Sequence, residues 1–366
     1  MRPYTLLTGL LPTQPPPSPQ TVKRVVLIRP CCIGDVVLAT AALKALRGLY
    51  THAHITWAVG GWSRRLVEGH DLLDAVLDTG PAANPARGPR GVLQFAQTLR
   101  RGNFDLAVSL VRSPWMSAAV LLSGVRYRAG LDSLGRGFGY NIRAGVDPAE
   151  PRHEAQIYLD AINQLGGETS DCYPNVPVRV DNREAIAAIL AERGVTGAYV
   201  VINPNGGRNP GMIMDAKRWP PGNFAALADA LVTQFGVSIV LLGGPDDTLT
   251  HDAVLAAMTH PATVFAGDLS FPQIAALAQG ARGYIGNDTG LTHMAGAAGA
   301  RTAMILGPSD PARYGPFTPP GQSITLWQPV DLHTGGVSAG TPTDWDWDRD
   351  GISADAVIAA VTAFLG

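Results

Sequence analysis

One stretch of the sequence combines residue types that could hold a negatively charged ligand. Residues 283–306, GYIGNDTGLTHMAGAAGARTAMIL, predict a strand, a turn, a helix and a second strand. The turn contains Asp288, Thr289, Gly290, Leu291, Thr292 and His293. Asp or Thr can cap a helix, glycine lets a ligand approach main-chain N–H groups, and the helix dipole favours an anion. We therefore expect this turn to bind an anion such as a diphosphate, the alternative being an ordinary capped turn.

A second stretch, residues 203–220, could bring positive charge to the same ligand. Its sequence, NPNGGRNPGMIMDAKRWP, leaves a predicted strand through two glycines and places a lysine and an arginine just before a helix. A cation there would neutralise charge on a leaving diphosphate. The candidate substrate-binding residues of this loop are Asn205, Gly206, Gly207, Lys217 and Arg218. The alternative is a solvated basic loop.

The third candidate is a carboxylate, Asp35. It follows Gly34 in the loop PCCIGD, which ends the first predicted strand, and we expect it to cap the helix that begins there. A carboxylate at the end of a parallel strand could act as a general base on a substrate hydroxyl. The alternative is that Asp35 serves as a helix cap alone. Gly34 is counted with it as a candidate substrate-binding residue.

The elements that must position these residues form two series of alternating strands and helices. The predicted strands are 22–29, 54–59, 74–78, 105–110, 198–204, 238–244, 263–268, 283–288 and 302–306. The predicted helices are 36–49, 62–68, 91–101, 114–123, 153–165, 221–235, 247–259, 271–279 and 353–365. Such alternation predicts an α/β fold of two doubly wound, Rossmann-like domains, with a cleft between the carboxyl ends of their strands. The Gly- and Arg-rich stretch 132–150 is predicted to be a loop.

Composition is consistent with two domains of ordinary size. We expect a disordered Pro-rich tail (1–21), a first domain (22–170), a linker (171–181), a second domain (182–352) and a terminal helix (353–366). The chain has 366 residues, of which 46 % are apolar, but no apolar run reaches the roughly 18 residues that a membrane span needs.

Three cysteines fit neither a disulfide framework nor a zinc site, which favours the cytoplasm. No G-x-G-x-x-G motif follows the first strand and no P-loop is present, so a nicotinamide or P-loop nucleotide site is not expected.

The charge is unevenly distributed along the chain. Residues 1–180 contain 19 basic and 13 acidic residues, whereas residues 181–366 contain 9 and 17. Arginine dominates, since Lys23, Lys44 and Lys217 are the only lysines. The basic first half favours an acidic partner, bound by bidentate arginines. The arginines considered for it are Arg64, Arg65, Arg112, Arg126, Arg128, Arg136 and Arg143, and a generic basic surface is the alternative.

Four motifs in this order resemble those of the ADP-heptose:lipopolysaccharide heptosyltransferases, glycosyltransferase family 9, which have the GT-B fold. They are RPCCIGDVVLATAALKALR, AKRWPPGNFAALADAL, LLGGPDD and GNDTGLTHMAGAAGA, and the resemblance covers about residues 22–330. It implies that Asp35 is the catalytic base, that Lys217 and the turn 288–293 bind the donor diphosphate, and that Asp246 or Asp247 lies near the donor's ribose or sugar. Arg64 and Arg65 lie where members of the family approach an acidic acceptor. This chain departs from the family at Cys31 and Cys32, in the longer loop RNPGMIMD and in the stretch 331–350.

These observations predict an inverting glycosyltransferase that moves a sugar, heptose by resemblance, from an ADP-sugar to a saccharide hydroxyl. No metal is expected, because no D-x-D pair precedes the sites, and no cofactor is expected besides the donor. The alternatives are a sugar-nucleotide epimerase of the same fold, a family member acting on an acceptor other than lipopolysaccharide, and a non-catalytic sensor of nucleotide sugars. Neither nucleic acid nor more than peripheral membrane contact is expected. The sequence leaves the oligomeric state open.

Overall fold

The computed structural model describes residues 12–209, 212–330 and 345–366. The chain forms two compact units that divide after Asn175, within the segment 171–181 that the sequence predicts to be a linker. Parts of the predicted N-terminal tail and of the stretch 331–350 lie outside the described residues. The rest of the tail contacts the first unit, where Gln14 N–H donates to the Asn141 carbonyl at 2.8 Å.

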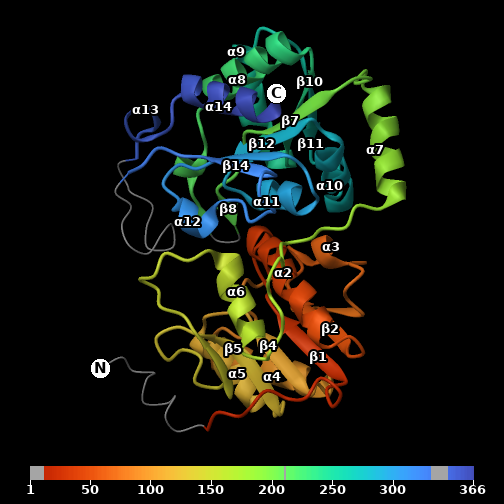
Figure 1. Ribbon diagram of the computed structural model, residues 1–366, viewed down its shortest axis with the longest axis vertical. Coiled ribbons are helices and arrows are strands. Elements are labelled where there is room, and N and C mark those ends of the chain that lie inside the picture. The colour runs from red at the N-terminus through yellow and green to blue at the C-terminus, as the bar shows by residue number, and fades with distance from the viewer. Residues whose placement is uncertain (1–11, 210–211, 331–344) are drawn as a thin grey trace. The chain divides into compact units, whose positions relative to one another are not determined.

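In the described part of the first unit, six parallel strands form one sheet (Figure 1). In spatial order they are β3 (Ala75–Asp78), β2 (His54–Val59), β1 (Arg24–Ile28), β4 (Leu106–Ser109), β5 (Tyr127–Asp132) and β6 (Ile142–Gly145). The strand β1 is central and its Val25–Ile28 run is fully buried. A central strand covered on both faces needs apolar residues in succession, which explains the unbroken run.

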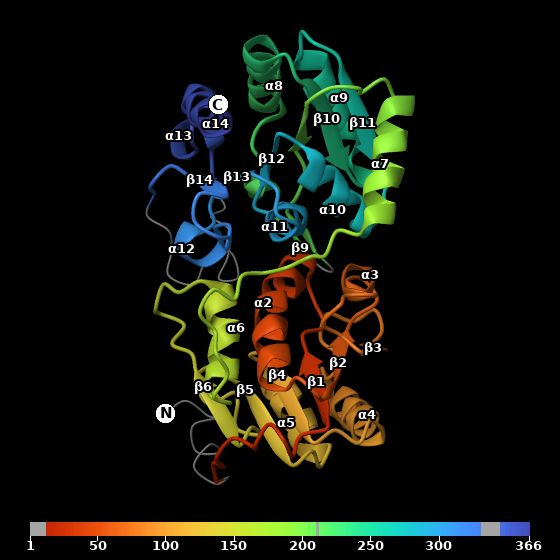
Figure 2. The same ribbon diagram turned by 45° about the vertical axis from the view of Figure 1, so that its right-hand side comes forward.

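The helices of the first unit lie on both faces of this sheet (Figures 1 and 2). They are α2 (Ile33–Leu49), α3 (Arg64–Val67), α4 (Gly88–Arg101), α5 (Pro114–Leu122) and α6 (Glu154–Asn163). The helices α4 and α5 bury Phe95, Leu99 and Met116 against Val26 and Ile28 of the central strand. On the other face, α2 and α6 pack against each other. This arrangement brings α6 beside the start of α2, where Asp35 lies.

The prediction that 132–150 is a loop is wrong in part. The strand β5 ends within it at Asp132, and β6 pairs with β5 between Ile142 and Gly145. Only Ile142 and Ala144 of the four residues in β6 are buried, so the apolar alternation is too short to be recognised among the glycines and arginines.

The described part of the second unit has the same architecture. Its six parallel strands are, in spatial order, β11 (Ala262–Ala266), β10 (Ser238–Gly243), β7 (Tyr199–Asn203), β12 (Gly283–Asn287), β13 (Thr302–Ile305) and β14 (Ser323–Leu326). Its α-helices are α7 (Val180–Glu192), α8 (Pro221–Phe235), α9 (Thr248–Ala257), α10 (Phe271–Gly280), α11 (Gly290–Ala297), α12 (Pro311–Tyr314), α13 (Trp347–Asp350) and α14 (Ala354–Leu365). Two short 3₁₀ turns, Asp215–Lys217 and Pro245–Asp247, and a small hairpin of β8 (Arg208–Asn209) and β9 (Met212–Ile213) follow the strands β7 and β10.

Several elements of the second unit were absent from the sequence prediction. The helix α7 begins within the predicted linker and buries only Ile186 and Leu190, so its apolar face is narrow. The strand β14 is an edge strand with mixed burial.

The predicted terminal helix is present as α14, which packs in the core of the second unit through Val357, Val361 and Leu365. No helix within the described residues is long and apolar enough to cross a membrane.

Candidate active site

Asp35 lies in the first turn of α2, at the carboxyl end of β1. The helix begins at Ile33 with Cys32 as its N-cap, so the prediction that Asp35 is itself the N-cap is wrong. Its carboxylate instead reaches back from the third helical position, where Oδ2 accepts the main-chain N–H of Cys32 at 3.3 Å. The side chain therefore supports the helix start, as a capping residue would, while 31 % of it stays exposed.

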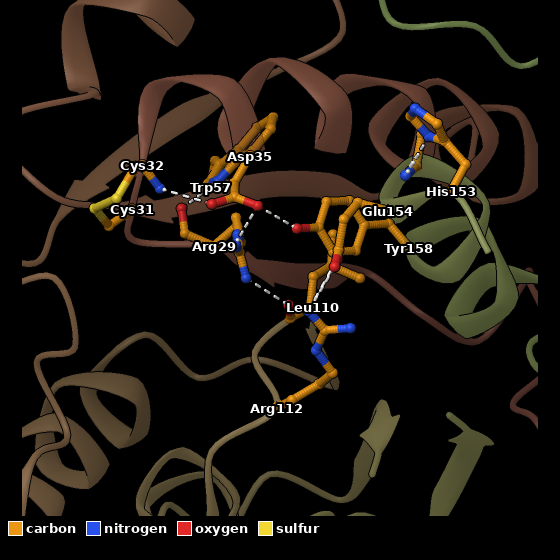
Figure 3. Close-up of polar contacts among 11 residues, drawn as sticks. Arg29, Cys31, Cys32, Asp35, Trp57, Leu110, Arg112, His153, Glu154 and Tyr158 are labelled. Carbon is orange, nitrogen blue, oxygen red and sulfur yellow. Dashed lines mark hydrogen bonds and ion pairs between the residues drawn. A yellow bond between two sulfur atoms is a disulfide. The ribbon is translucent and has the colours of Figure 1, made fainter. Parts of the chain in front are cut away.

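Two side chains hold the other oxygen of the Asp35 carboxylate (Figure 3). Arg29, which follows β1, approaches Oδ1 with Nη2 at 2.6 Å. Tyr158 of α6 donates its hydroxyl to the same Oδ1 at 2.6 Å, and the Arg29 guanidinium also lies over the Tyr158 ring. The Asp35 carboxylate is thus fixed through one oxygen, and its second oxygen carries only the long bond from Cys32 among the described contacts.

The electrostatics of this group keep the carboxylate ionised. Burial works to raise the pKa of Asp35, but the charge of Arg29 and the hydrogen bond from Tyr158 outweigh it, and the pKa lies below its usual range. Burial raises the pKa of the Tyr158 hydroxyl well above its usual value. Tyr158 therefore remains a hydrogen-bond donor, and Asp35 remains an acceptor, throughout the neutral range.

A second ion pair joins the first residue of α6, Glu154, to Arg112 in the segment between β4 and α5. Glu154 is 2 % exposed and accepts two hydrogen bonds from Arg112 Nη2, at 2.8 and 3.0 Å. Glu154 and Tyr158 are four residues apart on α6, so they share the face that looks onto Asp35 and Arg29 (Figure 3). Arg112 was predicted to contact an acidic acceptor, but here its guanidinium holds a carboxylate of the protein.

Other predicted acceptor arginines are also engaged internally. Arg64 pairs with Glu68 at 2.6 Å and with Asp78 at 3.0 Å. The Arg128 guanidinium donates to the carbonyls of Gly139 and Val125. Arg65 lies on α3 beside Arg64 and is exposed. The structure therefore brings Arg64 and Arg65 together on one short helix, with one of the two guanidinium groups already paired.

The cysteines beside Asp35 differ from the sequence prediction. Cys31 and Cys32 form a disulfide, whereas the sequence predicted no disulfide framework. The count and spacing of three cysteines could not reveal it, because the pairing joins adjacent residues. The disulfide removes the support that cysteine usage gave to a cytoplasmic location.

In the second unit, the turn after β12 has the predicted form. Thr289 is the N-cap of α11, and its Oγ1 accepts the main-chain N–H of Thr292 at 3.3 Å. The Thr292 hydroxyl donates to the Asn287 carbonyl at 2.7 Å, which closes the turn from inside. Gly290 and Leu291 occupy the first two helical positions, whose N–H groups have no partner within a helix.

Asp288 is the centre of a buried polar cluster in this turn. Its Oδ2 accepts Lys217 Nζ at 2.5 Å and the Ser309 hydroxyl at 2.6 Å, and His293 Nε2 lies 3.7 Å from Oδ1. Burial works to raise the pKa of Asp288, but the charge of Lys217 and the neighbouring His293 lower it strongly. Lys217 also lies over the Tyr314 ring, with Nζ 5.6 Å from its centre. The predicted lysine and the predicted turn thus come together around one carboxylate.

The loop after β7 packs closely on this turn. Gly206 and Gly207 have φ values of +136° and +71°, and a Cβ on Gly206 would collide with Thr289. Such backbone conformations require glycine. Arg218 Nε donates to the Gly206 carbonyl at 2.8 Å, and Nη1 pairs with Asp215 at 3.0 Å. Asn205 is buried and its Nδ2 donates to the Leu242 carbonyl at 3.2 Å.

Three predicted residues of the second unit each keep a buried polar atom without a hydrogen-bond partner among the described residues. These atoms are Asn205 Oδ1, Arg218 Nη2 and His293 Nδ1. Buried polar atoms in folded proteins are nearly always satisfied by protein, water or ligand. Two of these residues, Asn205 and Arg218, belong to the segment between β7 and α8, and His293 belongs to α11, so these buried atoms are consistent with a polar ligand near this part of the second unit.

The two carboxylates after β10 have different surroundings. Asp247 accepts the main-chain N–H of Gly244 at 2.8 Å and so stabilises the 3₁₀ turn. Asp246 is exposed. Of the pair, Asp246 is therefore the one whose carboxylate is not used in the turn.

Four residues of these clusters were missed by sequence reasoning. Arg29 follows β1 directly, Asn287 is the last residue of β12, and Ser309 lies in the loop after β13. The rule that ligands meet the carboxyl ends of parallel strands could have indicated all three. Tyr158, which lies on the helix α6, gave no such signal. Asn287 accepts the Trp219 N–H at 3.1 Å and donates to the carbonyls of Pro204 and Asn205, so it joins the loop after β7 to the turn.

Comparison with known proteins decides the family. The model of "Glycosyltransferase family 9 (heptosyltransferase)" matches residues 92–329. The chain belongs to glycosyltransferase family 9. It is 26 % identical to lipopolysaccharide heptosyltransferase 3 of Escherichia coli (strain K12) over 347 residues, which are 91 % of this chain and 95 % of that protein. It is 24 % identical to lipopolysaccharide heptosyltransferase 2 of the same strain over 315 residues, 81 % and 85 % of the two chains.

Solved structures confirm the predicted GT-B fold. A family 9 glycosyltransferase from Veillonella parvula DSM 2008 superposes with a TM-score of 0.76 at 22 % identity, over 94 % of this chain and 97 % of that one. ADP-heptose lps heptosyltransferase II of E. coli gives a TM-score of 0.71 at 20 % identity, over 93 % and 98 %. This family 9 member is therefore a heptosyltransferase-like glycosyltransferase, and the epimerase and sensor hypotheses are not retained.

Proposed function

We propose that the protein is an inverting glycosyltransferase that moves heptose from an ADP-sugar to a hydroxyl of a lipopolysaccharide core saccharide. Lipopolysaccharide heptosyltransferases of E. coli align with 91 % and 81 % of the chain, which supports heptose as the sugar and lipopolysaccharide as the acceptor. The observation that carries the mechanism is the Asp35 carboxylate, which is ionised, fixed through Oδ1 and open at Oδ2.

In this mechanism Asp35 is the general base. The oxygen of the acceptor hydroxyl forms the new bond to the anomeric carbon, and Asp35 Oδ2 accepts the proton that this hydroxyl loses. The bond from that carbon to the diphosphate breaks, and its electron pair leaves with the nucleoside diphosphate. Because the lowered pKa makes Asp35 a weak base, proton transfer comes late, after the acceptor oxygen has gained positive charge.

The second unit is proposed to hold the diphosphate without a metal ion. An ammonium has three N–H donors, and the described contacts of Lys217 use one of them on Asp288. The remaining donors, together with Arg218 Nη2 and the first N–H groups of α11, can neutralise the charge on the leaving group. The transfer assay that tests the mechanism is accordingly run in excess chelator.

The nucleotide preference gives a direct test of the donor assignment. In a thermal-shift titration we expect ADP to raise the melting temperature more than UDP or GDP at equal concentration, since a ligand that binds the folded state stabilises it. His293→Ala should reduce the ADP shift, because its buried imidazole lies within the diphosphate turn. A larger shift with UDP would contradict the ADP-sugar donor.

Tyr158 is proposed as a positioning residue for Asp35. In Tyr158→Phe the hydrogen bond that lowers the pKa of Asp35 is lost, so the pKa rises and the acid limb of the kcat/KM profile should move to higher pH. We expect kcat to fall about tenfold, because Oδ1 loses the donor that orients the carboxylate, and this loss of roughly 1.4 kcal/mol outweighs the gain in basicity. Tyr140→Phe is the matched control, because its hydroxyl donates to Ser109 at 2.9 Å inside the same unit. An unchanged acid limb in Tyr158→Phe would refute the role.

A further inference from the structure

An apolar stripe is exposed along the helix α5. Trp115, Ala118 and Leu122 recur at i, i+3 and i+7 and therefore share one face. Trp115 is 43 % exposed and Leu122 is 47 % exposed. The helix PWMSAAVLL contains no charged residue and its one polar residue, Ser117, is buried, so no polar side chain of α5 shields this stripe from water.

The neighbouring helix α4 exposes a basic stripe around one leucine. Arg90, Leu93 and Arg101 recur at i, i+3 and i+11 on one face, and Leu93 is 56 % exposed. The opposite faces of α4 and α5 are both buried against the same side of the sheet. The two exposed stripes therefore point away from the sheet on the same side of the unit.

Polar contacts hold the two helices side by side at both ends. Asn84 Nδ2 donates to Ser113 Oγ at 3.1 Å just before the helices begin. Arg100 Nε donates to the Ser123 carbonyl at 3.2 Å where they end. Figures 1 and 2 show α4 and α5 as neighbours in both views. The apolar and basic stripes thus form one continuous surface, which we call the α4–α5 face.

The sequence around this face is strongly depleted in acidic residues. Residues 79–131 contain seven arginines, no lysine and a single acidic residue, Asp105. The Asp105 carboxylate accepts the main-chain N–H groups of Lys23 and Arg24, at 2.8 and 2.9 Å, so part of its hydrogen-bonding capacity is used. The exposed arginines of this segment are Arg87, Arg90, Arg100, Arg101 and Arg126.

We propose that the α4–α5 face docks on the surface of an anionic lipid bilayer. Arginines bind lipid phosphates, while Trp and Leu side chains enter the boundary between headgroups and acyl chains. Of the six large apolar side chains exposed among the described residues, three lie on these two helices. An acidic protein or a nucleic acid would use the arginines but leave that apolar stripe in water. A symmetric pairing with a second copy would oppose two faces of the same positive charge.

The test is sedimentation of the full chain with lipid vesicles, in the absence of sugar nucleotide. Binding is expected to vesicles of phosphatidylcholine with phosphatidylglycerol, to be much weaker with phosphatidylcholine alone, and to decrease with added salt. Arg90→Gln with Arg101→Gln should weaken binding roughly 25-fold, at about fivefold for each arginine. Leu93→Ser with Leu122→Ser should weaken it about tenfold or more.

Matched controls come from the second unit. Arg179→Gln with Arg183→Gln removes two arginines, and Val180→Ser with Leu249→Ser removes two exposed apolar side chains, 59 % and 84 % exposed. Both controls should bind vesicles as the wild type does. Melting temperatures show whether each variant is folded. If one double variant of the α4–α5 face fails to fold, the vesicle binding of the other double variant tests the proposal.

Three results would overturn the proposal. The first is equal sedimentation with neutral and anionic vesicles, and the second is undiminished binding by both variants of the face. The third is a wild-type protein that binds no vesicles and forms a dimer in sedimentation velocity, where Leu93→Ser with Leu122→Ser is a monomer. That result would assign the face to a second copy of the chain. Because no glycosyl transfer is measured, these results are independent of the proposed reaction.

Discussion

Asp35→Asn is expected to lower turnover by roughly two to four powers of ten, the usual contribution of general base catalysis. Asparagine keeps the shape of the side chain but cannot accept the acceptor's proton as a carboxylate does. The affinity for ADP should stay within a few-fold of wild type, because the residues proposed to bind the diphosphate belong to the second unit. Single-turnover kinetics with saturating donor, beside an ADP titration, measure both quantities.

The control for Asp35→Asn is Asp160→Asn on the helix α6. Asp160 pairs with Arg152 at 2.7 Å and is partly exposed, so its loss should leave turnover close to wild type. Arg29 loses its charged partner in Asp35→Asn, so a circular-dichroism melt is needed to show that this variant is folded. Turnover near the wild-type rate in folded Asp35→Asn would remove Asp35 from the catalytic role.

The largest expected effect on stability concerns the ion pair between Lys217 and Asp288. Their side chains are 10 % and 6 % exposed, so Asp288→Ala leaves an ammonium buried without its carboxylate. Breaking such a pair costs about 3–5 kcal/mol of unfolding free energy, whereas replacing both partners is much less costly. Asp288→Ala with Lys217→Met should therefore recover most of the loss, as measured by urea unfolding.

An exposed pair provides the control for this cycle. Arg193 and Asp268 are 2.7 Å apart but 37 % and 45 % exposed, so Asp268→Ala should cost less than about 1 kcal/mol. The folded double variant should also bind ADP more weakly, by about 1.5–3 kcal/mol, since it lacks Lys217, the cation proposed to bind the diphosphate. A single variant Asp288→Ala as stable as wild type would contradict the account of this cluster.

The same pair gives stability a defined pH dependence. The pKa of Asp288 is depressed in the folded protein, so its contribution is present above the unfolded value of about 3.9. That contribution is lost as the pH falls below this value toward the folded pKa. The double variant should accordingly show a smaller loss of stability on acidification than the wild type.

The fold was predictable wherever apolar residues form long and regular patterns. The strand His54–Val59 and the helix Pro221–Phe235 have the predicted bounds, because the strand buries five successive residues and the helix has a clear apolar face. The edge strand β6 and the helix α7 were missed, since each buries only two side chains. Sequence patterns report burial, and elements with little burial leave little pattern.

The site was predictable only as far as local chemistry allows. The turn at Thr289 and the glycines 206 and 207 follow from capping and backbone requirements of single residues. The partner of Asp35 on α6, Tyr158, is 123 residues away, and no local pattern joins the two. The ion pair of Arg112 with Glu154 was also unforeseen, because the two residues are 42 apart in the sequence and become neighbours only in the fold. The pair of Arg64 with Glu68 could have been expected, since the two residues are four apart.

The most direct test of the central claim is transfer itself. The purified protein is incubated in excess chelator with ADP-heptose and a panel of lipopolysaccharide core saccharides, and the products are read by mass spectrometry. We expect one acceptor heavier by one heptosyl unit, an equal amount of ADP, an inverted anomeric linkage, and loss of all three in Asp35→Asn. Unchanged acceptors beside intact or epimerised ADP-heptose, or activity that only a divalent metal restores, would contradict the central claim.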